Sequence, residues 1–236
     1  MLRKKKNDLE WMEFELLQEF PTVKHGVFVN LDLGERGNRE DQLKILDLFQ
    51  VQGGKLRQVH KDGLVEIKAQ TEKLSYHENY DGMVTQEKNI GLLIRHADCQ
   101  SAIFYDPRQK ALANVHCGWR GSVQNIYQKT IQALHDLYGS QPSDLHVCIG
   151  PSLGPQFAEF KHYREELPKN FWSFQVKPEY FDFWAISQNQ LIQAGVPKKQ
   201  IEIAEICTYE NREECFSYRR NPNTPHHGTL ATLTSL

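Results

Sequence analysis

The segment HADCQSAIFYDPRQKALANVHCGWRG, residues 96–121, constrains the fold of this chain more than any other stretch. Two apolar runs, SAIFYD (101–106) and KALANVH (110–116), flank an Asp106-Pro107 step that is typical of a turn. Apolar runs of this length, bounded by turn residues, predict the two strands of a buried hairpin. Cys99 lies just before the first run and His116 ends the second, so reactive side chains stand where the predicted hairpin begins and ends.

Hydrophobic patterning along the rest of the chain predicts a mixture of strands and helices. Further strands are expected over residues 23–31, 55–60, 63–68, 90–95, 145–155, 201–207 and 228–236. Helical periodicity predicts helices over residues 39–50, 122–139 and 181–195. No linker divides the 236 residues, and strands and helices alternate without a regular βαβ rhythm. We therefore expect one domain over residues 1–236, of the α+β class, with mixed sheets.

Composition narrows the functional class. Lys and Arg number 28 against 30 Asp and Glu, so a net charge of −2 gives no general attraction to nucleic acid or to an acidic membrane surface. No stretch approaches the roughly 20 apolar residues of a membrane span. The basic run 3–6 is followed at once by acidic residues, which predicts a flexible, solvated terminus over residues 1–8 and no signal peptide. The five cysteines form no CxxC pair, so we expect reduced thiols in a cytoplasmic protein.

Three candidate metal ligands lie at predicted strand ends: His60 in RQVHKDG, Cys99 in RHADCQ and His116 in ANVHCGWRG. Two imidazoles and one thiolate would leave one tetrahedral position of a zinc ion open, as in catalytic zinc sites. Their spacing matches no zinc finger. The alternative interpretation is a buried thiol and two hydrogen-bonded core histidines, since free cysteine is among the most buried residue types.

Several further side chains have two possible roles. Asp98, beside Cys99, is either a proton relay or the residue that holds a turn. Trp119 is expected to pack, and Cys117 to face the opposite side of the sheet from His116. The pair His226-His227 is expected in an exposed loop, and Cys207 and Cys215 have no histidine near them in the sequence. Four arginines are candidates for holding a phosphate: Arg95, Arg120, Arg219 and Arg220.

The core segment 96–121, with RQVHKDG before it and CFSYRRN after it, resembles the YfiH family. Members of this family have been labelled laccase-type polyphenol oxidoreductases and are described as purine nucleoside enzymes related to the animal protein FAMIN. The resemblance extends from KHGVF (24–28) to the C-terminus. It implies a layered α/β/β/α fold, zinc ligands at His60, Cys99 and His116, and a nucleoside and phosphate as small-molecule partners.

The sequence also departs from the family pattern at two places. The segment HGVFVNLDLG (25–34) lacks the usual Arg-x-Gly-Gly loop, and TPHHG (224–228) stands where the family has Thr-Gly-Arg. Both changes remove an arginine that could bind an anion. The three metal ligands are unchanged by these departures. The resemblance therefore supports a metal site more strongly than any particular substrate.

Four functional hypotheses follow. The first is a zinc-dependent purine nucleoside enzyme that deaminates adenosine, or cleaves adenosine, inosine or guanosine with phosphate. The second is a cysteine hydrolase with Cys99 as nucleophile and His116 as base, of the amidase type proposed for editing cell-wall precursors. A multicopper oxidase is disfavoured because none of the ten histidines forms a His-x-His pair, although one copper could replace zinc at the same ligands. The fourth is a binding protein without activity.

Overall fold

The computed structural model describes residues 1–29, 31–33, 39–69 and 72–235. Two mixed β-sheets form its centre. The first sheet has the order β1 (Leu2–Lys6), β2 (Leu9–Glu13), β3 (Val23–Phe28), β15 (His227–Leu233), β8 (Ile90–His96), β4 (Gln52–Arg57) and β6 (Leu74–Glu78). The second has the order β14 (Ile201–Ile203), β11 (His146–Ile149), β9 (Gln100–Asp106), β10 (Ala111–Cys117), β7 (Gly82–Thr85) and β5 (Leu64–Glu66).

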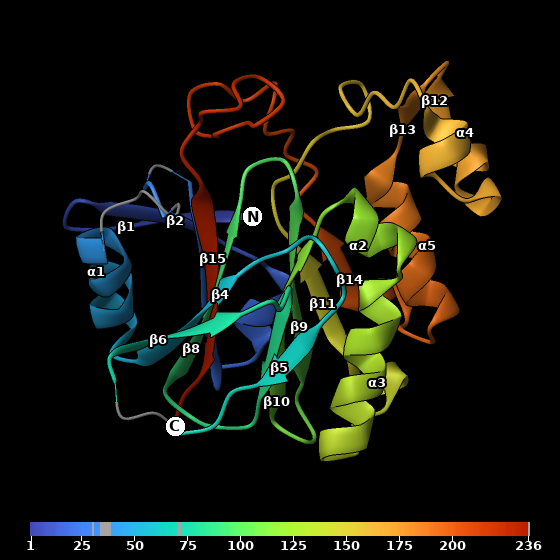
Figure 1. Ribbon diagram of the computed structural model, residues 1–236. Helices are drawn as coiled ribbons and strands as arrows, with labels where there is room; N and C mark the ends of the chain where they lie inside the picture. Colours follow the sequence, from blue (N-terminus) through green and yellow to red (C-terminus); the bar gives the residue numbers. More distant parts are fainter. Residues whose placement is uncertain (30, 34–38, 70–71, 236) are drawn as a thin grey trace.

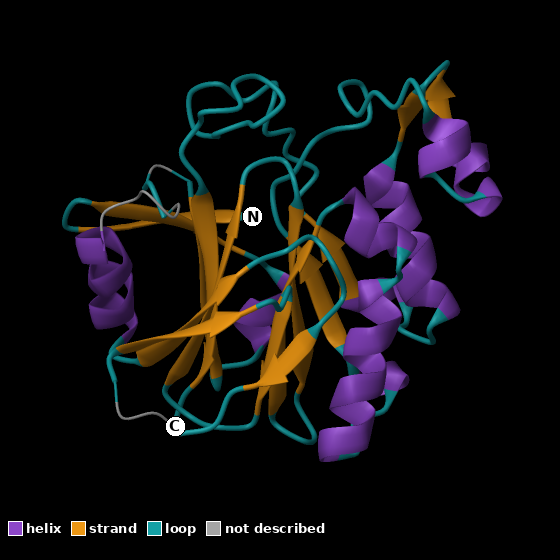
Figure 2. Ribbon diagram, viewed as in Figure 1, coloured by secondary structure: helices purple, strands orange, loops and turns teal. Residues whose placement is uncertain are grey.

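Helices cover the outer faces of both sheets, as Figures 1 and 2 show. One helix, α1 (Arg39–Phe49), lies on the first sheet, and α3 (Ile126–Tyr138) lies on the second with α5 (Phe183–Gln193) beside it. The remaining short elements are α2 (Trp119–Val123), α4 (Tyr163–Glu166), β12 (Gln175–Lys177), β13 (Tyr180–Phe181) and the 3-10 turns η1 (Leu16–Glu19), η2 (Pro142–Asp144), η3 (Lys169–Phe174) and η4 (Lys198–Gln200). The predicted α/β/β/α layering with mixed sheets is confirmed.

Alternation along the central strands explains why both faces of each sheet are buried. In β8, Leu92 and Ile94 belong to the core between the sheets, whereas Leu93 packs with Leu46 of α1. In β10, Leu112 faces the other sheet and the alternate residues pack against α3. Strands buried on both faces read as continuous apolar runs, which is why the sequence predicted them.

The predicted hairpin is present, with β9 and β10 antiparallel from Asp106↔Ala111 to Gln100↔Cys117. The expected single helix over 122–139 is wrong in one respect, because it is divided into α2 and α3 at Asn125. Asn125 has a left-handed backbone (φ 54°), and its side chain accepts a hydrogen bond from the Gln128 N–H, so it starts a new helix.

The N-terminus also differs from the prediction. Instead of a flexible terminus over residues 1–8, Leu2–Lys6 form β1, which pairs antiparallel with β2 at the edge of the first sheet. Its side chains are exposed, as expected for a basic run, and Arg3 makes a two-pronged ion pair with Glu214. Backbone pairing therefore orders a segment that has no apolar face of its own.

Some expectations fall partly outside the described residues. The strand predicted over 23–31 and the segment 25–34 include residues 30 and 34, and the last predicted strand includes residue 236. Within the described ranges, no helix is long and apolar enough to cross a bilayer.

Candidate metal centre and its cavity

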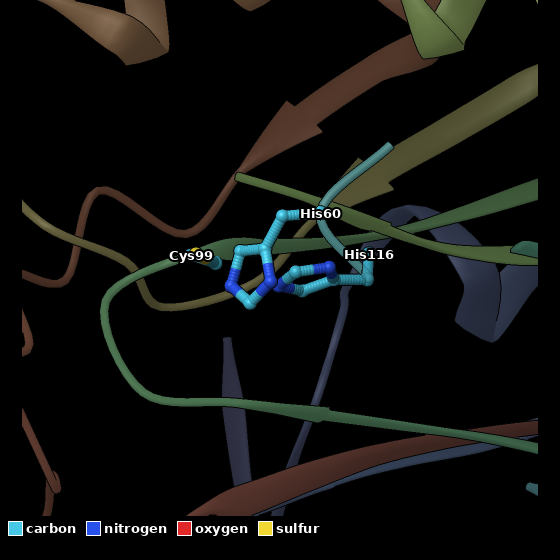
Figure 3. A group of neighbouring side chains, drawn as sticks. All are labelled: His60, Cys99 and His116. Atoms are coloured by element: carbon cyan, nitrogen blue, oxygen red, sulfur yellow. The ribbon is translucent and has the colours of Figure 1, made fainter. Parts of the chain in front are cut away.

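His60, Cys99 and His116 meet at one end of the two sheets. Their potential ligand atoms all lie within 4.8 Å of one another, and the two imidazole rings are 4.8 Å apart and nearly perpendicular. Figure 3 shows the two rings next to each other with Cys99 beside them, each residue on a different segment of the chain. His60 is exposed, Cys99 is half-buried and His116 is buried. The juxtaposition that a shared metal requires is therefore present.

Each of the three residues is positioned by a strand end. His60 follows β4 in a loop with a left-handed backbone (φ 57°), Cys99 lies between β8 and β9, and His116 is the penultimate residue of β10. Gly118 has no side chain, which leaves room for His60 and Cys99 to lie close to its backbone. A Cβ at this position would lie 3.1 Å from Cys99 Sγ and 3.2 Å from His60 Cδ2, which is tighter than ordinary packing.

Asp81 holds this arrangement in place and was not among the predicted site residues. Its fully buried carboxylate accepts hydrogen bonds from His116 Nδ1 (2.9 Å) and from the backbone N–H groups of His60 (2.9 Å) and Lys61 (2.7 Å). Burial raises the pKa of this carboxyl. The hydrogen bonds, led by that of His116, lower it by more, so the net pKa is below its usual value. The sequence offered one indication of Asp81, because the Asp81-Gly82 step precedes the short apolar run 83–85.

Cys99 and His116 shift each other's protonation. Burial by itself raises the pKa of the Cys99 thiol, but the neighbouring His116 and His60 lower it, and the net pKa is below its usual value. Burial also lowers the pKa of His116, but Cys99 and Asp81 raise it to above its usual value. The charges thus favour a thiolate, which is the form in which cysteine binds metal ions or attacks a substrate.

The donor set fits a zinc ion. Bond lengths of about 2.0 Å to nitrogen and about 2.3 Å to sulfur place tetrahedral ligand atoms about 3.5 Å apart, and His60 lies on an exposed loop that can adjust to this spacing. Because the Asp81 carboxylate is an acceptor, His116 Nδ1 carries the proton and Nε2 is left for the metal. A ligating histidine bonded to a carboxylate in this way is typical of zinc proteins.

A cavity of about 1010 Å³ opens beside the three residues. Its wall is aromatic on the side of the helices, where it includes Trp119, Phe160 and Phe183, and polar on the side of the first sheet, where it includes His96 and His226. Ligand sites commonly have volumes of about 300–1,000 Å³. This cavity is therefore large enough for a small organic substrate together with an ion.

Three of the four candidate arginines line this cavity. Arg120 stacks on the Trp119 ring at 4.1 Å. Arg95 is almost fully buried, and Arg219 donates from both Nη atoms to the Glu159 carbonyl (3.3 and 3.2 Å). Arg220 is turned away from the cavity and donates to the carbonyls of residues 208, 209 and 215, which it ties together.

Asp98 lies in the cavity wall but its carboxylate is already bound. One oxygen accepts from Thr208 Oγ1 and the other from the Arg219 N–H, both at 2.6 Å. Its backbone is left-handed (φ 84°), and its carbonyl accepts from the Leu153 N–H. These contacts join three loops around Cys99, and they favour the turn-holding interpretation over a proton relay.

Among the described residues, no other cysteine or histidine belongs to the group of potential metal ligands. Cys117 is buried against the helices on the opposite face from His116, as predicted, and burial raises its thiol pKa to about 12. Neither Cys207 nor Cys215 is part of a group of described residues that could hold a metal ion. The expectation of an exposed pair at 226–227 is wrong for His227, which begins β15 and is 0% exposed because strand pairing carries it into the interior.

Comparison with known proteins assigns the fold. The YlmD protein of Geobacillus stearothermophilus superimposes with a TM-score of 0.83, at 20% identity, over 99% of both chains. The hypothetical protein YfiH of Bacillus licheniformis gives a TM-score of 0.81, also at 20% identity, over 92% of this chain and 95% of that one. At such identities the match shows a shared fold.

Several curated relatives carry the name purine nucleoside phosphorylase. That of Bacteroides thetaiotaomicron is 33% identical over 149 residues, which are 59% of this chain and 55% of the relative. That of Xylella fastidiosa strain Temecula1 is 26% identical over 94% of this chain and 92% of its own length. The chain spans about half the length of the first two curated relatives that it matches. The model of the family described as multi-copper polyphenol oxidoreductase laccase matches residues 36–236, and the chain therefore belongs to this laccase-like YfiH family.

Proposed function

We propose that this protein is a zinc-dependent purine nucleoside phosphorylase, with the metal bound by His60, Cys99 and His116. The observation that carries the proposal is the meeting of these three ligand atoms within 4.8 Å, in the wall of a cavity of about 1010 Å³. Relatives named purine nucleoside phosphorylase supply the substrate class. Adenosine, inosine and guanosine are the substrates to test.

The reaction transfers a ribosyl group from a purine to phosphate. An oxygen of inorganic phosphate forms a bond to ribose C1′, the C1′–N9 bond breaks, and the purine leaves with the bonding electron pair and takes up a proton. A zinc ion would supply a Lewis acid for the charge that develops on an oxygen or nitrogen atom. The protein must hold phosphate and nucleoside in line and exclude water, which would otherwise compete as the nucleophile.

Arg120 is the arginine best placed to hold the phosphate. Its guanidinium lies on the Trp119 ring (4.1 Å), at an exposed edge of the cavity. Stacking leaves the N–H groups at the rim of the guanidinium plane for a bidentate contact with an anion. Arg95 contributes positive charge to the same cavity, whereas Arg219 and Asp98 position the loops around Cys99.

A product assay tests the reaction. Adenosine, inosine and guanosine are incubated with and without phosphate and the products are separated by chromatography. We expect free purine base and ribose 1-phosphate in the presence of phosphate only. Deamination, which could use the same zinc, would instead convert adenosine to inosine without phosphate. Turnover of none of the three nucleosides would contradict the proposal.

A pair of cysteine variants tests the metal. Cys99→Ala should lose most of the bound zinc and at least about 10²-fold in activity, because it opens the coordination sphere. Cys117→Ala is the matched control, since its buried thiol faces the helices and should leave zinc content unchanged. Metal analysis of protein purified without added metal also identifies copper, which binds N and S ligands more tightly than zinc does. Equal zinc in both variants would rule out Cys99 as a ligand.

A specific observation favours a second candidate, a cysteine hydrolase. Cys99, His116 and Asp81 form a chain in which a thiolate adjoins an imidazole that is held by a carboxylate. This is the arrangement of a nucleophile, its base and an orienting acid. The carboxylate serves a metal ligand equally well, so the geometry alone fits both candidates.

Alkylation separates the two. If zinc is bound, iodoacetamide should react with Cys99 faster after a chelator has removed the metal, and zinc should restore the lost activity. His60→Ala should then be nearly as damaging as Cys99→Ala. If Cys99 is a free nucleophile, alkylation is fast from the start, chelators have no effect, and metal-free protein is fully active.

A further inference from the structure

His96 lines the cavity and has one ring nitrogen that the proposed metal site does not use. It is the last residue of β8, lines the cavity and is 1% exposed. Its Nε2 lies 2.9 Å from Thr229 Oγ1, which lies 2.7 Å from Ser101 Oγ. Thr229 holds the imidazole in place, and Ser101 holds the Thr229 hydroxyl. The other nitrogen, Nδ1, is buried and has no hydrogen-bond partner among the described residues.

The position of His96 in the sheet explains why this nitrogen is buried. Ile94, two residues earlier on the same face of β8, lies in the core between the sheets. His96 thus follows this apolar residue on the same face, at the end of the strand. His227 of β15 is its cross-strand neighbour, and the two rings are 4.6 Å apart. Burial is the main reason that the pKa values of His96 and His227 are lowered, the second to about 3. Both rings are therefore uncharged near neutral pH.

A buried polar atom without a partner is costly and calls for an explanation. An uncharged imidazole nitrogen offers either one N–H or one lone pair, depending on the tautomer. A hydroxyl group complements both, because it donates and accepts. The charge that we assign to phosphate binding comes from Arg120, which belongs to α2 on the side of the helices.

The walls of the cavity are divided in the way that a nucleoside requires. Aromatic side chains that can stack on a purine, Trp119 and Phe183, come from the side of the helices. His96 comes from the first sheet, and Cys99 lies in the loop between β8 and β9. A nucleoside has its base at one end, its hydroxylated sugar at the other and the reacting bond between them.

We propose that His96 Nδ1 hydrogen-bonds to a ribose hydroxyl of the substrate and so makes the site selective for ribonucleosides over deoxyribonucleosides. This assignment rests on the proposed function. Thr229 and Ser101 orient the ring, and His227 packs behind it. His96 is thus a binding residue for the sugar, separate from the three metal ligands.

The test compares kcat/KM for adenosine with kcat/KM for its 2′-deoxy and 3′-deoxy analogues, in wild-type protein and in His96→Phe. Deoxygenation alters the intrinsic strength of the glycosidic bond, but this effect is common to both proteins and cancels when the ratios are compared. For at least one analogue, the preference for adenosine should fall about tenfold or more in His96→Phe, as expected for the loss of one buried hydrogen bond. His96→Gln, which keeps a hydrogen-bonding group, should retain part of the preference.

His227→Phe is the matched control, because it changes the neighbouring buried histidine, which does not line the cavity. It should keep the wild-type preference. An unchanged ratio in His96→Phe, or an equal loss in both variants, would overturn the assignment. If a variant does not fold, calorimetry on wild-type protein compares the affinities for inosine and 2′,3′-dideoxyinosine. Equal affinities would contradict the role of His96. Absence of phosphate-dependent turnover in wild type would refute the proposed function itself, and this assignment with it.

Discussion

Asp81 shows how one residue can organise a site without entering it. Its carboxylate joins β10, through His116, to the loop that carries His60, and the Asp81 carbonyl also accepts from the His116 N–H (2.6 Å). A histidine whose Nδ1 is bound in this way has a single orientation and a single tautomer. The His116 ring is therefore oriented before any metal binds, whereas Asp81 holds only the backbone of His60.

Replacing Asp81 with Asn tests this role. Asn can donate to Nδ1 as well as accept, so the tautomer is no longer specified, and we expect zinc affinity to fall about 10- to 100-fold. Competition with a chromophoric chelator measures the affinity. Asp106→Asn is the control, since Asp106 is equally buried but accepts from the backbone N–H groups of Arg108 and Gln109 at the other end of the hairpin. Equal affinities in the two variants would remove Asp81 from the site.

At the scale of elements, apolar runs predicted the longest buried strands and missed the short buried strand β7 as well as exposed strands that depend on pairing. The runs that became β8, β9 and β10 are buried on all seven residues of each strand, so composition alone marked them. β1 is exposed along its whole length and β6 is partly exposed, and neither was expected. Backbone hydrogen bonds to a neighbour order such strands, and a neighbour distant in sequence leaves no local signal.

The break between α2 and α3 gives a prediction of its own. Asn125 caps α3 and has a positive φ of 54°. Asn125→Ala loses the cap and strains the backbone, so we expect it to lower the free energy of unfolding by about 2 kcal/mol. Asn125→Gly keeps the backbone relaxed and should cost less than about 1 kcal/mol. Urea denaturation measures both, and equal losses would mean that backbone strain has no part in the effect.

For the whole molecule, buried histidines predict instability in acid. His25, in β3, is 2% exposed, and burial lowers its pKa to about 4. Below pH 6.5 the unfolded chain takes up a proton that the folded protein accepts only near pH 4. Stability should therefore be lost as the pH falls through this range, and by about 2 kcal/mol between pH 7 and pH 5 for this residue.

His25→Gln isolates the contribution of His25, because glutamine can still accept the Phe14 N–H that His25 Nε2 accepts at 2.7 Å. Unfolding in urea at pH 7 and pH 5 should show a smaller acid loss in the variant than in wild type. His96 and His227 remain in both proteins and cancel in the comparison. An identical pH dependence would mean that His25 is not neutral in the folded state.

The sequence by itself determined which segments are buried and where the reactive side chains stand along them. These are local properties, because the hydrophobic periodicity and the neighbours along the chain decide them. They include the apolar runs, the Asp106-Pro107 turn and the positions of His60, Cys99 and His116. The tertiary structure alone decided which distant residues meet. That Asp81 binds His116 and that His227 is buried beside His96 both follow from strand order and register. These depend on contacts between segments far apart in the chain, which no local pattern encodes.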